Sequence, residues 1–334
     1  MTELAKLSRP GLASVHERER RFARLDECRQ RAGAVWIGGP PGAGKTTLGA
    51  RSLDGARHRD RPPAFPDPAL ELGVRPPRPD ARAWPWPIKV HTLGRFELLL
   101  DDQPLHAVGK TQRKPMALLK ALIVLGGADV PEAKLIDVVW AESLGGDGQK
   151  AFDVTVHRLR KLLGHDASVQ VSDRRVSLNR EVVWVDLWAL ERQLAAVVPG
   201  AHARRPDGVQ LERAAPAILD LYRGHLLDGE ADSAWLLPVR NRLNGRFQRF
   251  VIRLGEHWEA NGKWECAAEL YERGVELDPL AESFYCRLMV CLRQQGHRAE
   301  AMQAFRRCRQ MLSVTLGVKP TETTEAEYRE LLDS

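Results

Sequence analysis

Two stretches of this sequence contain residues whose types and spacing suit the chemistry of phosphate groups. The first is the phosphate-loop motif GPPGAGKT at residues 39–46, directly after the short apolar run AVWI. In such a loop, glycines allow main-chain amides to surround a phosphate, while a lysine and a threonine serve the phosphate and Mg²⁺. The residues that would do this are Gly39, Gly42, Gly44, Lys45 and Thr46. The motif alone would predict binding of ATP.

The surroundings of this loop do not favour a working ATPase. A phosphate-loop ATPase needs several parallel strands, an acidic residue on a following strand for Mg²⁺, and a residue that orients water. Only the proline-rich segment 57–87 follows here, and the later run VVWVD at 182–186 is better explained as a strand of another domain. We therefore interpret the loop as a remnant left by an internal deletion. We expect no enzymatic activity and no cofactor, with ATP and Mg²⁺ kept as the alternative.

The second stretch is the amphipathic segment 149–163. Its apolar residues Phe152, Val156, Leu159 and Leu163 are four, three and four positions apart, which places them on one face of a helix. The opposite face would carry Lys150, Val154, His157, Arg158 and Lys161. Basic side chains can reach guanine acceptors or phosphates in the major groove, and a valine can contact a thymine methyl group. The alternative is an ordinary solvated helix face.

Two flanking segments could contact the same DNA duplex. Arg174 and Arg175 lie at the tip of a predicted hairpin, where a wing would meet the DNA backbone or the minor groove. Lys110, Thr111 and Arg113 lie at the start of a predicted helix, where free amides and basic side chains favour phosphate binding. Together with the amphipathic helix, these residues predict a DNA-binding surface.

The elements around these residues have the order of a winged helix-turn-helix with an extra sheet in front. Residues 88–94 and 95–101 are predicted strands, and the polar turn SDRR separates two more strands of a hairpin. Between them we expect three helices, at 115–127, 131–140 and 149–163. This predicts an α+β DNA-binding domain over residues 88–186, preceded by a largely irregular segment. That segment comprises residues 1–56, with the phosphate loop, and a linker rich in proline and arginine at 57–87.

From Leu187 onward the apolar residues recur at a helical period, so residues 187–334 are predicted to be all-α and the chain mainly α. A shift of 34 residues aligns Arg253 with Arg287, and Ala267 with Ala301. Tetratricopeptide-like helix pairs have this period, because a small alanine lets two helices approach closely. Accidental similarity between two helical hairpins is the alternative.

Composition excludes several other classes. The formal net charge is +6, and the five cysteines form no CxxC pair. No apolar run reaches the roughly 18 residues that a membrane span needs. We therefore expect reduced packing thiols, no metal site, no membrane contact and a cytoplasmic protein.

The order of motifs from residue 88 onward resembles a known family. HTLGRFELLLDDQPL, TQRKPMALLKALI, LIDVVW and VTVHRLRKLLG are similar to the response-regulator type of winged helix in the Streptomyces antibiotic regulatory protein (SARP) family. LDLYRGHLLDG and ELDPLAESFYCRLMVCLRQQGHRAEAMQAF resemble the bacterial transcriptional activator domain that follows it. In the wing, RRVSL replaces the glycine-tyrosine turn usual in the family.

The resemblance implies a sequence-specific transcription activator that binds promoter DNA as a homodimer at repeated half-sites and contacts RNA polymerase. Two alternatives remain open. The first 50 residues also resemble large signal-transduction ATPases, which would make the protein a nucleotide-gated regulator. The helical repeats could instead form a protein-binding scaffold on which the winged helix only packs.

Overall fold

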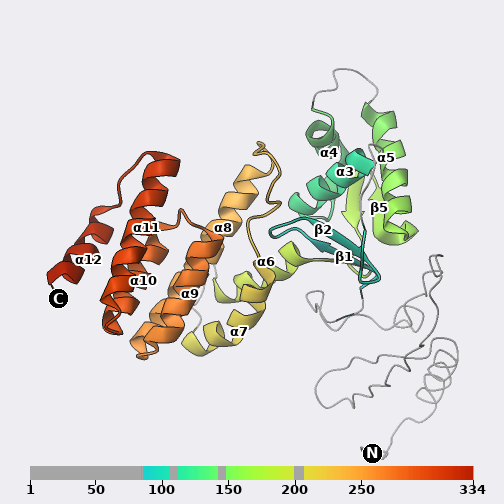
Figure 1. Ribbon diagram of the computed structural model, residues 1–334. Coiled ribbons are helices and arrows are strands. Elements are labelled where there is room, and N and C mark those ends of the chain that lie inside the picture. Colours follow the sequence, from blue (N-terminus) through green and yellow to red (C-terminus); the bar gives the residue numbers. More distant parts are fainter. Residues whose placement is uncertain (1–83, 85, 106–111, 142–147, 199–206, 334) are drawn as a thin grey trace, which may run out of the picture. The chain divides into compact units, whose positions relative to one another are not determined.

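The computed structural model describes Trp84 and residues 86–105, 112–141, 148–198 and 207–333 (Figure 1). The chain divides into two units, residues 1–87 and residues 88–334. In the first unit, the side chains of Trp84 and Trp86 are buried, and the Trp86 amide donates to the Trp84 carbonyl at 2.8 Å. The second unit contains the elements that position the candidate site.

A four-stranded sheet opens this second unit, with strand order β3-β2-β1-β7. Strands β1 (Ile88–His91), β2 (Glu97–Leu100) and β3 (Gln103–Pro104) form an antiparallel meander, whereas β7 (Val183–Val185) pairs with β1 in parallel. Asp101 and Asp102, between β2 and β3, both have positive φ, as a two-residue turn of the mirror-image type requires. The sheet therefore joins β1, at the start of this unit, to β7, which lies nearly 100 residues later in the sequence.

Three helices and a small sheet complete the winged helix. The helices are α3 (Arg113–Val124), α4 (Glu132–Val139) and α5 (Gly148–Leu163), with a short 3₁₀ helix, η2, at Asp166–Ser168. The wing consists of β5 (Val169–Ser172) and β6 (Arg175–Leu178), and β4 (Val130–Pro131) pairs with β6. Leu118, Leu122, Phe152 and Leu159 are almost completely buried, so α3 and α5 share one apolar core.

The rest of the described chain is helical. Helices α6 (Asp186–Val197) and α7 (Gly208–Leu221) form a first pair. Asp207 caps the start of α7 with a capping box: its side chain accepts a hydrogen bond from the Gln210 amide, and the Gln210 side chain accepts one from the Asp207 amide. The remaining helices are α8 (Leu237–Ala260), α9 (Trp264–Leu277), α10 (Glu282–Gln294), α11 (Arg298–Leu316) and α12 (Glu322–Asp333). In Figure 1, α8 to α12 lie side by side as an array.

The 34-residue periodicity corresponds to this array. Ala267 and Ala301 are fully buried at equivalent positions of α9 and α11. A methyl group built on Gly255 of α8 would lie 2.1 Å from the Tyr271 hydroxyl oxygen, so only glycine lets α8 and α9 approach this closely. The structure adds the pair α6 and α7 in front of the two helix pairs that the alignment covers.

The mainly α fold, with a winged helix followed by a helical domain, is thus confirmed, and the tetratricopeptide-like nature of that domain stays a prediction. The phosphate-loop residues Gly39, Gly42, Gly44, Lys45 and Thr46, and the irregular segment predicted around them, lie outside the described residues. Among the helices that the structure describes, none combines the length and apolar character that a membrane span requires.

Candidate nucleic-acid interface

Helix α5 has a buried side and an exposed side. Phe152, Val156, Leu159 and Leu163 are at most 4% exposed, and Thr155 is buried with its hydroxyl donating to the Ala151 carbonyl at 2.6 Å. The apolar face predicted from the sequence is therefore the face that packs against α3 and α4. Its burial fixes which residues of α5 remain for contact with another molecule.

The residues predicted for DNA contact lie on the exposed side of α5. All five are exposed: Lys150, Val154, His157, Arg158 and Lys161. Val154 is 48% exposed, whereas Phe152, Val156, Leu159 and Leu163 of the same helix are buried. Asp153, which the sequence analysis did not single out, is exposed beside them. A carboxylate there would repel phosphates but could accept a hydrogen bond from cytosine.

Polar contacts hold α5 at both ends. At its start, the Gln149 side chain donates to Glu132, the first residue of α4. Near its end, Arg160 Nε donates to the Val169 carbonyl of β5 at 2.9 Å. Arg160 therefore holds the wing against α5, whereas its neighbours Arg158 and Lys161 make no such contact with the wing in the described part of the chain.

The wing has a tight two-residue turn at its tip. Asp173 and Arg174 have φ of 50° and 57°, so this turn belongs to the mirror-image class that matches the twist of a hairpin. The Arg174 carbonyl accepts a hydrogen bond from the Glu132 amide at 2.9 Å, which ties the tip to the start of α4. Arg174 itself is exposed.

The two wing arginines differ in their surroundings. Arg175 Nη1 donates to both the carbonyl and the side chain of Asp129, each at 3.0 Å, and its side chain is half exposed. Within the described residues, the Arg174 side chain has no hydrogen-bond or ion-pair partner. Arg174 is thus the freer of the two cations predicted for the wing.

At the start of α3, the structure describes only part of the predicted phosphate contact. Arg113 is the first residue of the helix and is exposed. Lys110 and Thr111 lie outside the described residues. The next residue, Lys114, donates to the Val139 carbonyl at 2.7 Å and lies over the Trp140 ring, so it joins α3 to α4.

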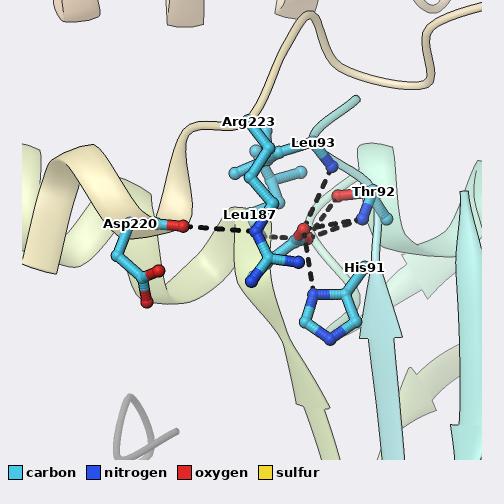
Figure 2. A network of polar contacts seen from close by, with 7 residues as sticks. His91, Thr92, Leu93, Leu187, Asp220 and Arg223 are labelled. Carbon is cyan, nitrogen blue, oxygen red and sulfur yellow. Dashed lines mark hydrogen bonds and ion pairs between the residues drawn. The ribbon is translucent and has the colours of Figure 1, made fainter. Parts of the chain in front are cut away.

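A buried carboxylate joins the winged helix to the helical domain. Asp186, the first residue of α6, is 1% exposed and directly follows β7. As Figure 2 shows, its oxygens accept hydrogen bonds from the Thr92 amide, the Thr92 hydroxyl and the Leu93 amide, and it also bonds the Leu187 amide. His91 Nδ1 lies 3.7 Å from the same carboxylate. The chain after β1 is therefore bonded to the helix that follows the last strand.

Further contacts strengthen this junction. Arg180 Nη2 donates to the Gly126 carbonyl at 3.1 Å, and its guanidinium lies 4.6 Å from the centre of the Trp188 ring. Burial, and secondarily Arg192, lowers the pKa of Arg180, although a guanidinium stays protonated. On the other side, Lys120 of α3 forms an ion pair with Glu230 in the loop before α8. Winged helix and helical domain are thus in polar contact through several separate segments.

Metal binding and thiol chemistry find little support among the described residues. These residues contain no group of three or more His, Cys, Asp or Glu residues that could hold a metal ion. Burial raises the pKa of Cys291 to about 11 and that of Cys308 to about 12, which leaves both thiols protonated and unreactive near neutral pH. The exposed side of α5 and the wing are the best-supported candidate site.

Known bacterial regulators are similar to this winged helix and to the helical domain that directly follows it. Residues 185–332 match the model of the bacterial transcriptional activator domain. The chain is 30% identical over 218 residues to "Regulatory protein AfsR" of Streptomyces griseus, in a match that covers 64% of this chain and 22% of that protein. The resemblance to SARP-type regulators is thereby confirmed.

A solved structure shows the same fold. "Mycobacterium tuberculosis EmbR in complex with low affinity phosphopeptide" matches with a TM-score of 0.55 and 23% sequence identity. The match covers 74% of this chain and 65% of that one. The chain thus spans about a fifth of the curated relative's length and about two thirds of the solved chain.

Proposed function

We propose that this protein is a transcription activator that reads promoter DNA with α5 and contacts the backbone with its wing. The observation that carries the proposal is the division of α5 into a buried apolar face and an exposed face with Lys150, His157, Arg158 and Lys161. A helix with this division, supported by a wing, fits the major groove. The match of the following residues to an activator domain supports the same function.

The proposal assigns different roles to the residues of the site. Arg158 and Val154 contact base edges, because an arginine can bond guanine in a bidentate manner and a valine can pack on a thymine methyl group. Lys150, His157 and Lys161 bind phosphates or bases beside them. Arg174, Arg175, Arg113, Lys110 and Thr111 contact the backbone and fix the register. The helical domain supplies homodimer contacts on repeated half-sites and contacts RNA polymerase.

The test is DNA binding by single-residue variants of the full chain. On DNA from the protein's own upstream region, Lys161→Ala should weaken binding to all sequences alike and reduce the salt dependence by about one phosphate contact. Arg158→Ala should cost about 1–3 kcal/mol at the preferred site and relax the preference at one base pair. Footprinting and mobility shifts measure both effects.

A matched control is available on α11. Arg306 is exposed and lies far from α5 in the sequence. The variant Arg306→Ala should therefore leave DNA affinity unchanged. Binding without any salt dependence, or without any effect of Arg158 and Lys161, would favour a protein-binding scaffold instead.

A further inference from the structure

Helix α8 carries four arginines on one line. Arg242, Arg246, Arg249 and Arg253 are four, three and four positions apart, so they form a single stripe along the helix. The apolar residues of α8, such as Phe247, Phe250 and Leu254, are fully buried on a different side. The arginine stripe, defined by these four residues, ends one turn before the exposed Glu256.

The stripe has far fewer carboxylates than cations among the described residues. Glu191 of α6 pairs with Arg242 at 3.3 Å, and its carbonyl accepts from Arg246 Nη2 at 3.4 Å. Burial lowers the pKa of Arg246, and the charges of Arg242 and Arg249 lower it further against the opposing effect of Glu191. The stripe therefore holds like charges close together with only partial compensation.

Two of the arginines have donors without acceptors in the described structure. Among the described residues, the exposed Arg249 side chain has no hydrogen-bond or ion-pair partner, and its guanidinium lies near Gly245 one turn earlier. Arg253 is half-buried, and its Nη1 is shielded from solvent without a hydrogen-bond partner. A guanidinium group that lacks an acceptor is unfavourable, and an anion bound at the accessible part of this half-buried side chain would supply one.

We propose that the arginine stripe is a docking surface for an extended acidic segment of a partner protein. This rests on the proposed role of the helical domain as a protein-contact module, but it is independent of DNA binding by α5. The spacing supports an extended chain, because the stripe covers about 16 Å of helix axis in steps of about 4.5 to 6 Å. Alternate side chains of an extended peptide are about 6.6 Å apart, so successive carboxylates can meet successive guanidinium groups.

A peptide fits this surface better than a DNA backbone does. Arg246 and Arg253 are only partly exposed, so a slender chain can reach them more readily than the broad surface of a duplex. Arginine also forms bidentate bonds with carboxylates, which would satisfy the donors that lack partners.

The experiment measures fluorescence anisotropy of a labelled peptide in which Glu alternates with Ser, titrated with the full chain. A peptide with Gln in place of Glu serves as the probe control. The variant Arg242→Gln/Arg249→Gln changes two exposed residues, so it should keep the fold. We expect it to weaken binding of the Glu peptide at least about tenfold, while Arg306→Gln has no effect. A second variant, Arg249→Gln/Arg253→Gln, should weaken binding at least as much.

Three results would overturn the proposal. They are failure of the Glu peptide to bind, equal binding of the Gln peptide, and equal affinity of the stripe variants and the wild type. If the same variants instead reduced affinity for a duplex of unrelated sequence, the stripe would be a DNA-backbone contact. Promoter binding that depends on Arg158 can persist in every one of these cases, so failure here is distinguishable from failure of the DNA-binding proposal.

Discussion

The carboxylate of Asp186 accepts hydrogen bonds from both the amide and the hydroxyl of Thr92, at 2.8 Å and 2.7 Å, across 94 residues of sequence. Both residues are almost completely buried. One anion thereby satisfies donors from the end of β1 and from the start of α6. Removal of the acceptor would leave several buried donors unpaired, and each of those is costly.

We therefore expect Asp186→Ala to lower the free energy of unfolding by about 3 kcal/mol. Urea denaturation of the full chain measures this. Asp137→Ala, at an exposed position of α4, is the matched control and should change stability by less than about 0.5 kcal/mol. Similar stabilities of the two variants would show that the buried carboxylate contributes little.

Gly127 provides a second test of the junction between the domains. A methyl group built there would lie 1.9 Å from the Trp188 ring, whereas one built on Gly126 meets nothing within 4 Å. Both glycines have positive φ, so alanine strains the backbone at either position. We expect Gly127→Ala to destabilise the protein by about 2 kcal/mol more than Gly126→Ala does.

Thermal or urea unfolding of both glycine variants checks this difference. Adding Trp188→Leu to Gly127→Ala should recover part of the loss, because the collision is removed but the backbone strain is not. Equal effects at the two glycines would contradict close packing of Trp188 on Gly127.

The unequal surroundings of the wing arginines predict unequal effects on DNA binding, if the proposed function holds. Arg174→Gln should reduce affinity and lower the salt dependence by about one counterion. Asp129→Asn should have the opposite effect, because it removes the carboxylate that pairs with Arg175 at 3.0 Å and frees that guanidinium for phosphate. Mobility shifts over a range of salt concentrations measure the effects of both variants on DNA affinity. A loss of affinity in Asp129→Asn would contradict this expectation and show that the ion pair orients Arg175 toward DNA.

The cysteines should differ in their reaction with iodoacetamide. Cys266 is exposed, whereas burial raises the pKa of Cys291 to about 11 and that of Cys308 to about 12. A raised pKa lowers the thiolate fraction at a given pH, and the thiolate is the reactive form. At pH 8 we expect Cys266 to be alkylated well before Cys291 and Cys308, as read by peptide mass spectrometry.

Unfolding in urea should abolish this order of alkylation. Early modification of Cys291 in the folded chain would show that the α10 core opens readily.

Local sequence patterns were sufficient for most elements of the winged helix. The apolar spacing predicted a helix at residues 149–163, and α5 occupies Gly148–Leu163. The polar segment SDRR joins β5 to β6 as predicted, with Ser172 ending β5 and Arg175 beginning β6, because hydrophobic alternation and turn residues act over a few positions. The same spacing identified which face of α5 is buried.

Contacts between distant residues could not be predicted in this way. The sequence analysis treated Arg174 and Arg175 alike, but Arg175 meets Asp129 because β4 pairs with β6, 46 residues apart. The sequence analysis placed Asp186 at the end of an apolar strand, and nothing near it in the sequence indicates a bond to Thr92. The assignment of individual residues to DNA contact stays a prediction.

Val185 is the last residue of β7 and Asp186 the first of α6, so the two halves of this unit share a boundary without a spacer. Modules connected in this way are difficult to exchange. A chimera cut after Val185 would separate the transplanted winged helix from Asp186, the aspartate that bonds the end of its first strand. A winged helix taken from a related protein therefore has to include this aspartate. Recombination between such regulators should therefore tolerate breakpoints beyond α6 far better than breakpoints at the apparent domain border.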